Sequence, residues 1–180
     1  MIHFERMMLV RKAQHIQRFH TRTMLHRQSV GEHTFGVLCI LLEVVPEASD
    51  TLIKAALYHD VAEAETGDVP SPTLHEFTDI GRAVKAAEQW VNHRHGISFE
   101  LTDREKDILE FCDSMECMVY CLEEWYRGNR NALAISENCA DSIRKNSLHK
   151  VSPQAEMLFG MYNVKLNNEL INEEDVDERE

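Results

Sequence analysis

The stretch that decides the fold is residues 56–72, which read ALYHDVAEAETGDVPSP. His59 and Asp60 are adjacent after the apolar run at residues 52–57, and Glu63 follows within one helical turn of both. An imidazole beside a carboxylate is a suitable ligand pair for a divalent transition metal. A carboxylate one turn further along can accept a proton from water bound to that metal. The same pair also occurs at ordinary helix ends without any function, so the pattern alone leaves both interpretations open.

Two further residues could complete a metal site. His33 lies near the start of a predicted helix, and Asp113 lies within a long predicted helix among apolar neighbours. A buried carboxylate needs a cation or hydrogen-bond partners, because burial of a bare charge is costly. We therefore predict a site of two imidazoles and two carboxylates from three helices, with room for water and a phosphate oxygen. For Asp113 alone, an exposed position on an amphipathic helix is the simpler alternative.

Helical spacing of apolar residues, without strand-like alternation, runs along most of the chain. Thr102 and Glu105 form a capping-box pattern, and Ser152 precedes a proline at the first position of a helix. We predict an all-α fold with helices at about residues 4–18, 31–45, 48–64, 79–95, 102–127, 129–150 and 152–172. Residues 19–30 are predicted to be a loop of a length at which function is common. We expect one domain, residues 1–172, and a disordered acidic tail, residues 173–180.

The charge of the chain is uneven. The formal net charge of −12 argues against a surface for polymeric nucleic acid. Residues 1–33 nevertheless hold six Lys or Arg and two acids, whereas residues 173–180 hold six acids and one Arg. A basic segment in an acidic protein suits a small anionic ligand, although a solvated helix face gives the same composition.

The five cysteines are an odd number with no C-x-x-C pattern, so they are predicted to be free thiols in a reducing compartment. The first residues lack the apolar stretch of a signal peptide, and no apolar run approaches the roughly 20 residues that span a membrane. We therefore expect a cytoplasmic protein without a membrane segment.

The order His…His-Asp…Asp on an all-helical chain resembles the HD-domain metal-dependent phosphohydrolases. The resemblance spans about residues 10–120, and within that superfamily the chain looks closest to the small 5′-deoxynucleotidases and the phage deoxyadenosine triphosphate (dATP) triphosphohydrolases. It implies a single-domain HD-type helical bundle. The residues that carry it are Arg18-Phe19, Glu32-His33, His59-Asp60-x-x-Glu63, Thr66-Gly67-Asp68-Val69-Pro70 and Asp113.

The resemblance implies a divalent ion, Co²⁺, Zn²⁺ or Mn²⁺, and a possible second divalent ion on the phosphates. Glu63 would position or deprotonate the attacking water, and Arg18 would orient the phosphate next to the sugar. The ligands implied for the first ion are His33, His59, Asp60 and Asp113.

On the substrate side, the resemblance implies that Asp68 holds the sugar 3′-hydroxyl. Phe19 would stack on the base where the nucleotidases carry Trp, with a smaller ring that lacks the N–H group. A wall that excludes a 2′-hydroxyl would be formed by Val69, Pro70 and Ser71.

The resemblance leaves two substrates open. The nucleotidases often carry a Lys shortly after the Pro-x-Pro motif, where this chain reads Thr73-Leu74-His75, and residues 20–33 look more like the phage enzymes. We therefore favour a purine triphosphate substrate, with dATP and water giving deoxyadenosine and tripolyphosphate. The alternative is a 5′-deoxynucleotidase that releases phosphate from deoxynucleoside monophosphates. Candidate cations for extra phosphates are Arg22, Arg27, Arg82 and Lys85.

Three other functions compete with these two. A guanosine tetraphosphate hydrolase typically has Glu-Asp where this chain has Glu63-Ala64. A helical oxygenase with two irons needs further ordered histidines, and the spacing of the available ones differs. A non-catalytic nucleotide-binding module would not need Glu63 and Asp68. We further expect a homo-oligomer.

Overall fold

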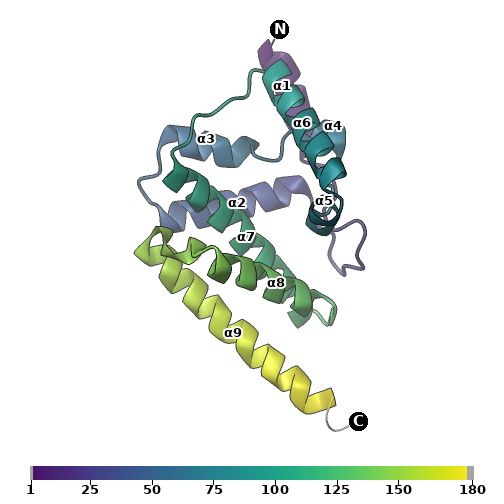
Figure 1. Ribbon diagram of the computed structural model, residues 1–180, viewed down its shortest axis with the longest axis vertical. Helices are drawn as coiled ribbons and strands as arrows, with labels where there is room; N and C mark the ends of the chain where they lie inside the picture. Colours follow the sequence, from purple (N-terminus) through teal and green to yellow (C-terminus); the bar gives the residue numbers. More distant parts are fainter. Residues whose placement is uncertain (1, 178–180) are drawn as a thin grey trace. The chain divides into compact units, whose positions relative to one another are not determined.

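The computed structural model describes residues 2–177, with side chains at residues 3–170, and the chain is all-α there (Figure 1). Within these residues the pairing of Gln17 with Ser29 is an isolated β-bridge, and there is no strand. None of the described helices is both long and apolar enough to cross a membrane. The elements are α1 (Ile2–Ala13), α2 (Val30–Val44), α3 (Asp50–Tyr58), α4 (Glu63–Thr66), α5 (Ser71–Glu76), α6 (Thr78–Arg94), α7 (Asp103–Tyr126), α8 (Ala132–Lys145), the 3₁₀ helix η1 (Leu148–Val151) and α9 (Pro153–Asp177).

The chain divides into two compact units, and the first comprises Met1–Gly36 and Ser49–Glu100. Its small core joins α1, α4 and α6, which lie side by side in Figure 1. Burial of this core fixes the short α4 helix against two longer ones. The core residues are Leu9, Ala13, Val61, Ala62, Ala64, Val91 and Ile97.

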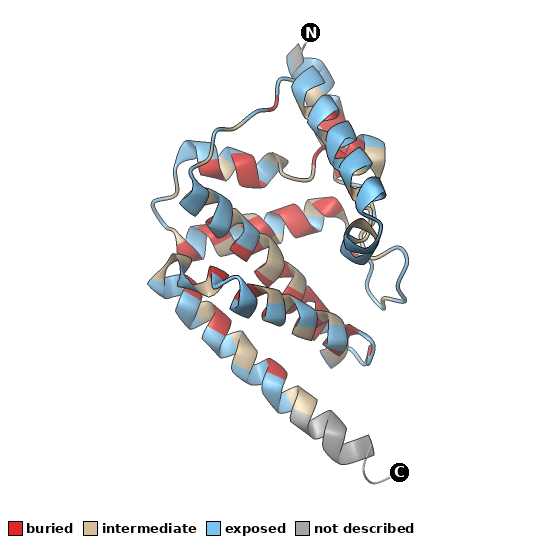
Figure 2. Cartoon of the chain, viewed as in Figure 1, coloured by how far each residue is buried: buried red, intermediate tan, exposed pale blue. Residues whose placement is uncertain are grey.

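The second unit comprises Val37–Ala48 and Leu101–Glu180, with α7 packed against α8, η1 and α9. The predicted capping box is present, because the Thr102 side chain accepts from the Glu105 N–H and the Glu105 carboxylate accepts from the Thr102 N–H. Ser152 Oγ accepts from the Ala155 N–H at 3.0 Å, which confirms the predicted start of α9. Most residues of α7 from Ile108 onward are buried or half-buried, as Figure 2 shows by colour.

The first predicted helix is five residues too long, because α1 ends at Ala13. The backbone of the next residues bonds across the chain: the Val30 N–H donates to the Ile16 carbonyl, and the Arg18 N–H donates to the Gln28 carbonyl, both at 2.9 Å. These cross-chain bonds compete with continuation of the helix. They close the loop of residues 17–29 at its base.

Two local features start α2 at this closed loop. The Glu32 carboxylate accepts from the Ser29 N–H at 2.7 Å, and the Glu32 N–H donates to Ser29 Oγ at 3.2 Å, which makes a capping box. At Gly31 the backbone approaches Gln14 so closely that an added Cβ would lie 3.0 Å from Gln14 Cβ. A larger residue at position 31 would therefore press against Gln14.

The predicted helix at residues 48–64 is interrupted. The helix α3 ends at Tyr58, and α4 begins at Glu63. Between them the Val61 N–H donates to Tyr58 and the Glu63 N–H donates to Asp60, in the tighter pattern of a 3₁₀ turn. Glu63 is therefore not on one continuous α-helix with His59 and Asp60, contrary to the prediction. A 3₁₀ turn still aligns residues three apart, here Asp60 and Glu63.

The other differences are also local. Residues 71–76 form the short helix α5, where we predicted the end of a loop, because proline is tolerated in the first turn of a helix. The segment predicted as one helix at 129–150 is split into α8 and η1, with Ser147 in the left-handed conformation at φ 55° between them. The helix α9 continues to Asp177. The predicted tail thus falls partly within α9 and, at residues 178–180, outside the described residues.

The contact at Gly31 gives a stability prediction. In a helix, replacing glycine by alanine normally stabilises a protein by about 1 kcal/mol, but overpacking costs about 1–3 kcal/mol. We expect Gly31→Ala to destabilise the protein by about 1 kcal/mol net, because the new methyl group meets Gln14. The measurement is urea unfolding followed by circular dichroism.

Gly160→Ala is the matched control, because Gly160 lies within α9 and an added Cβ meets no atom within 4 Å. We expect this variant to be more stable than the wild type. Stabilisation by both substitutions would show that the segment at Gln14 yields easily.

Candidate metal centre and active site

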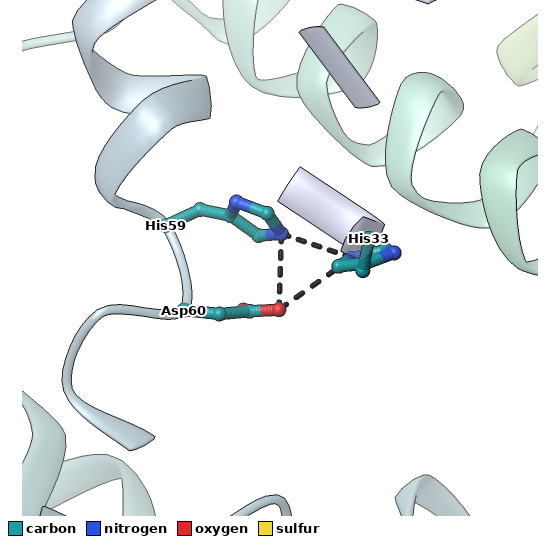
Figure 3. Close-up of side chains that lie close together, drawn as sticks. All are labelled: His33, His59 and Asp60. Atoms are coloured by element: carbon teal, nitrogen blue, oxygen red, sulfur yellow. Dashed lines mark hydrogen bonds and ion pairs between the residues drawn. The ribbon is translucent and has the colours of Figure 1, made fainter. Parts of the chain in front are cut away.

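Three side chains of the first unit converge on one point (Figure 3). His33 comes from the first turns of α2, and His59 and Asp60 come from the turn after α3. The distances between their nearest atoms are 3.2 Å for His33 Nε2 and His59 Nε2, 3.1 Å for His59 Nε2 and Asp60 Oδ2, and 3.5 Å for His33 Nε2 and Asp60 Oδ2. His33 is fully buried, so its imidazole is held in place by the surrounding core.

The tautomer of His59 follows from its second contact. His59 Nδ1 lies 2.8 Å from the Ala56 carbonyl oxygen, which can only accept a hydrogen bond. In the neutral ring the proton is therefore on Nδ1, and Nε2 presents a lone pair. A histidine that donates to a carbonyl through one nitrogen and offers the other is the usual arrangement of a metal ligand.

These distances fit a divalent ion. Bonds of about 2.0–2.2 Å place neighbouring ligand atoms roughly 3.0–3.5 Å apart, depending on the coordination number. The donor set of two imidazoles and one carboxylate suits zinc and related transition metals. Near this cluster Glu63 Oε2 is buried and has no hydrogen-bond partner among the described residues. A cation would compensate both the converging lone pairs and this carboxylate.

The electrostatics of the carboxylates point the same way. Burial raises the pKa of Asp60, but the charges of His59, His33 and Arg18 and the hydrogen bond of His59 outweigh burial, so the pKa is lowered overall. For Glu63, burial together with the charges of Asp60 and Asp68 raises the pKa to about 9, although Arg18 opposes the shift. The carboxylates of Asp60 and Asp68 both disfavour ionisation of Glu63, and a cation bound at the cluster would oppose this effect.

The predicted phosphate and sugar residues also meet. The Phe19 N–H donates to Asp68 Oδ2 at 3.2 Å, with Phe19 in the left-handed conformation at φ 55°. The Arg18 guanidinium lies 5.5 Å from the Phe19 ring centroid and donates to Gln28 Oε1 at 3.3 Å. Burial raises the pKa of Asp68, and the charge of Arg18 is the largest influence that opposes this. The base of the closed loop thus holds Arg18 and Phe19 beside Asp68.

The remaining predicted substrate residues lie at the edges of these groups. Val69 and Pro70 are half-buried in the segment between α4 and α5, and Ser71 is exposed at the start of α5. Arg22 and Lys85 are exposed. The charge of Lys85 lowers the pKa of Glu88, so Lys85 lies near that carboxylate.

Two of the weaker candidates have no described link to the cluster. Arg82 forms an ion pair with Asp79 on its own helix, and Arg27 is exposed in the loop before α2.

Asp113 is half-buried on α7, in the second unit. Burial and the charge of Asp113 raise the pKa of the neighbouring Cys112 thiol to about 12. The assignment of Asp113 as the fourth metal ligand stays a prediction.

Sequence reasoning missed two residues of this region. Gln28 is buried and accepts from the Arg18 guanidinium. Glu88 on α6 is half-buried; burial and the charge of Asp60 raise its pKa. Gln28 lies in the stretch of residues 20–33 that resembles the phage enzymes but was not singled out within it, and Glu88 belongs to no recognisable motif.

A known family and a curated protein match this chain in sequence. The model of the family described as 5′-deoxynucleotidase YfbR-like matches residues 3–159. The 5′-deoxynucleotidase YfbR of Escherichia coli O127:H6 (strain E2348/69 / EPEC) is 29% identical over 93 residues, which are 43% of this chain and 47% of the relative. The match thus spans about half the length of the curated relative.

Solved structures share the fold. The PH0347 protein from Pyrococcus horikoshii OT3 has a TM-score of 0.68 at 21% identity, covering 91% of this chain and 99% of that one. The HD phosphohydrolase DatZ of cyanophage S-2L, solved with dA and one catalytic Zn²⁺ ion, has a TM-score of 0.63 at 16% identity, covering 89% and 96%. The family match confirms the resemblance to the small 5′-deoxynucleotidases, and the described residues are all-α as predicted.

The raised pKa of Glu63 predicts how stability depends on pH in the metal-free protein. Glu63 ionises near pH 4.5 when unfolded and near 9 when folded, so the folded state binds more protons in this window. The wild type should therefore lose stability as pH rises, by at most about 1.4 kcal/mol per unit from this group. Glu63→Gln removes this pH-dependent loss. In chelator-treated samples, the free energy of unfolding of the variant relative to the wild type should therefore increase from pH 5 to 9.

Glu65→Gln is the control for this measurement. Glu65 lies two residues away, and the hydrogen bond from Lys12 lowers its pKa. The stabilisation by ionised Glu65 is present above its unfolded pKa and is lost as the pH falls. The stability of Glu65→Gln relative to the wild type should therefore not increase toward alkaline pH. An advantage of Glu63→Gln that is independent of pH would contradict the assigned protonation.

Proposed function

Because the chain belongs to the YfbR-like 5′-deoxynucleotidase family, we propose that it is a metal-dependent phosphohydrolase of deoxynucleotides. In this proposal it cleaves at the 5′ phosphate and releases the deoxynucleoside. The observation that carries the proposal is the convergence of His33, His59 and Asp60. A bare surface cluster would need neither the burial of His33 nor the orientation of His59 through its second nitrogen.

The ion would be held by these three residues, with Asp113 as the proposed fourth ligand. A divalent ion supplies Lewis acidity toward a phosphate oxygen and makes water more acidic. Zn²⁺, Co²⁺ and Mn²⁺ all suit the donor set, and DatZ was solved with Zn²⁺. A second divalent ion on the phosphates would offset the charge of the remaining carboxylates.

Glu63 is the proposed proton acceptor for the attacking water. It lies one tight turn after Asp60, and positive charge at the ligand cluster favours its ionised form. Arg18 is proposed to orient the phosphate, since its charge acts on Asp60, Glu63 and Asp68 alike. Attack in line with the bond to the 5′ oxygen would then release the deoxynucleoside.

Asp68 is proposed to bind the sugar, and Phe19 is proposed to stack on the base. Since the Phe19 N–H already donates to the Asp68 carboxylate, the stacking ring and the acceptor for the 3′-hydroxyl are held together. Val69, Pro70 and Ser71 continue from Asp68 and would line the side of the sugar where a 2′-hydroxyl would lie.

Two substrates fit this arrangement. The basic loop from Arg18 to Arg27 and the missing Lys after Pro72 favour dATP, hydrolysed to deoxyadenosine and tripolyphosphate. The family model and the curated relative favour deoxynucleoside monophosphates, hydrolysed to the deoxynucleoside and phosphate. Both reactions attack the same phosphorus atom, so the cations beyond the first phosphate decide between them. Arg22 and Lys85 are the proposed extra contacts.

A pair of variants tests the roles of Asp60 and Glu63. Asp60→Ala should leave a folded helical protein that loses its divalent ion and its activity, because one ligand is gone. Glu63→Ala should retain the ion but lose about 10²–10⁴-fold in rate. Plasma mass spectrometry gives the metal content, and circular dichroism verifies folding. Full activity of metal-stripped Asp60→Ala would overturn the metal site, and loss of the ion from Glu63→Ala would make Glu63 a ligand.

Product chromatography tests the substrate. Deoxyadenosine mono-, di- and triphosphate are offered separately to the metal-loaded protein. Tripolyphosphate and deoxyadenosine appearing together from the triphosphate would support the dATP assignment, and Arg22→Ala should then slow that reaction. Rapid phosphate release from the monophosphate with an inert triphosphate would establish the 5′-deoxynucleotidase instead. Absence of hydrolysis of all three would contradict the phosphohydrolase itself.

A further inference from the structure

An open groove lies between α1 and α6 in the first unit, and we call it the α1–α6 groove. It encloses about 850 Å³, within the range of sites for small molecules, roughly 300–1,000 Å³. None of its lining residues belongs to the His33–His59–Asp60 cluster. The residues that define it here are Phe4, Arg11, Lys12, Trp90, Arg94 and His95.

The lining carries a local excess of positive charge. Arg11, Lys12 and Arg94 face two carboxylates, Glu5 and Glu65, in a chain whose net charge is −12. Lys12 bonds Glu65 at 2.9 Å, but both side chains are about half exposed, so a ligand anion can compete for the ammonium group. The groove is therefore a place where a small anion can overcome the repulsion of the whole protein.

The same groove exposes aromatic faces on both of its walls. Trp90 on α6 is 59% exposed and Phe4 on α1 is 71% exposed, although large aromatic surfaces are normally covered. The Arg94 guanidinium lies 5.3 Å from the Trp90 ring centroid, so cation and ring already form one unit. A planar ligand with a negative group would match both features.

A buried polar atom adds a third feature. His95 Nδ1 is buried and has no hydrogen-bond partner among the residues that the structure describes. His95 follows the last residue of α6, and its charge acts on Glu65 together with those of Lys12 and Arg94. The groove thus offers an unused hydrogen-bonding position beside its cations.

We propose that the α1–α6 groove is a second nucleotide-binding site, separate from the metal centre. The base would stack on Trp90, and the phosphate would bind Lys12 and Arg94. A nucleoside phosphate combines the planar ring and the anion that the walls match, whereas a nucleoside or a bare phosphate would use only half of them. A second copy of the chain on this surface is the competing occupant, and it is one outcome of the test.

The test measures binding of a nucleotide that cannot be hydrolysed, deoxyadenosine with a methylenephosphonate in place of the 5′ phosphate. In a Trp125→Phe background the fluorescence reports Trp90, and calorimetry on the metal-loaded wild type counts the sites. We expect saturable fluorescence change and two sites. Lys12→Ala and Arg94→Ala should each weaken binding at the groove by about tenfold, since charge-assisted contacts to phosphate are lost.

Lys106→Ala is the matched control. Lys106 also forms an exposed ion pair, with Asp103 at 2.8 Å, and its removal changes the net charge equally. It should alter binding by less than about twofold. Equal weakening by Lys106→Ala, binding that leaves the Trp90 fluorescence unchanged, or equal binding of tripolyphosphate or deoxyadenosine alone would overturn the proposal. Fluorescence that depends on protein concentration and not on the probe would assign the groove to contact between copies. The result does not depend on whether the protein hydrolyses nucleotides.

Discussion

Neutralisation of buried negative charge is the constraint on which the candidate site depends. Asp60, Glu63, Asp68 and Glu88 act on one another electrostatically, with Arg18 as the nearby guanidinium. Carboxylates that share a poorly solvated region cannot all be ionised unless a cation is present. Glu63 is the group whose pKa responds most, because its Oε2 atom is buried without a partner. A cation at the His33–His59–Asp60 cluster would compensate the carboxylates, and in the proposed reaction it would also reduce their repulsion of an anionic substrate.

The tight turn between α3 and α4 is what concentrates this charge. In a continuous α-helix residues three apart are offset, whereas in a 3₁₀ turn they are aligned. The hydrogen bond from the Glu63 N–H to the Asp60 carbonyl sets this geometry. Burial of Val61, Ala62 and Ala64 between α1 and α6 then holds the turn in place. Small apolar residues next to the catalytic candidates are therefore part of the site's construction, because they let α4 pack closely.

Local signals in the sequence predicted the parts of the fold that depend on neighbouring residues. The capping box at Thr102 and the start at Ser152 need only contacts within one turn, and both are present. The same capping-box signature, Ser29-x-x-Glu32, stands at the start of α2 and was not used, although it fixes that helix start. The end of α1 could not be predicted in this way, because it is decided by backbone bonds that join Ile16 to Val30 and Arg18 to Gln28, far along the chain.

The candidate site divides along the same line. Adjacency of His59 and Asp60 was visible in the sequence, and His33 was predicted to complete the site. The structure brings His33 within 3.5 Å of both, and the role of the three residues as ligands stays a prediction. Gln28 and Glu88 were invisible, because their relation to the site arises from the closed loop and from the packing of α6. The closed loop of residues 17–29 contributes most to this arrangement. At its base the Arg18 guanidinium donates to Gln28, and the Phe19 N–H donates to Asp68. A residue in the left-handed conformation, as Phe19 is, persists when surrounding contacts hold it. The bond to Asp68 is such a contact, so the Phe19 ring and the Asp68 carboxylate, which are the proposed base-binding and sugar-binding groups, are positioned together.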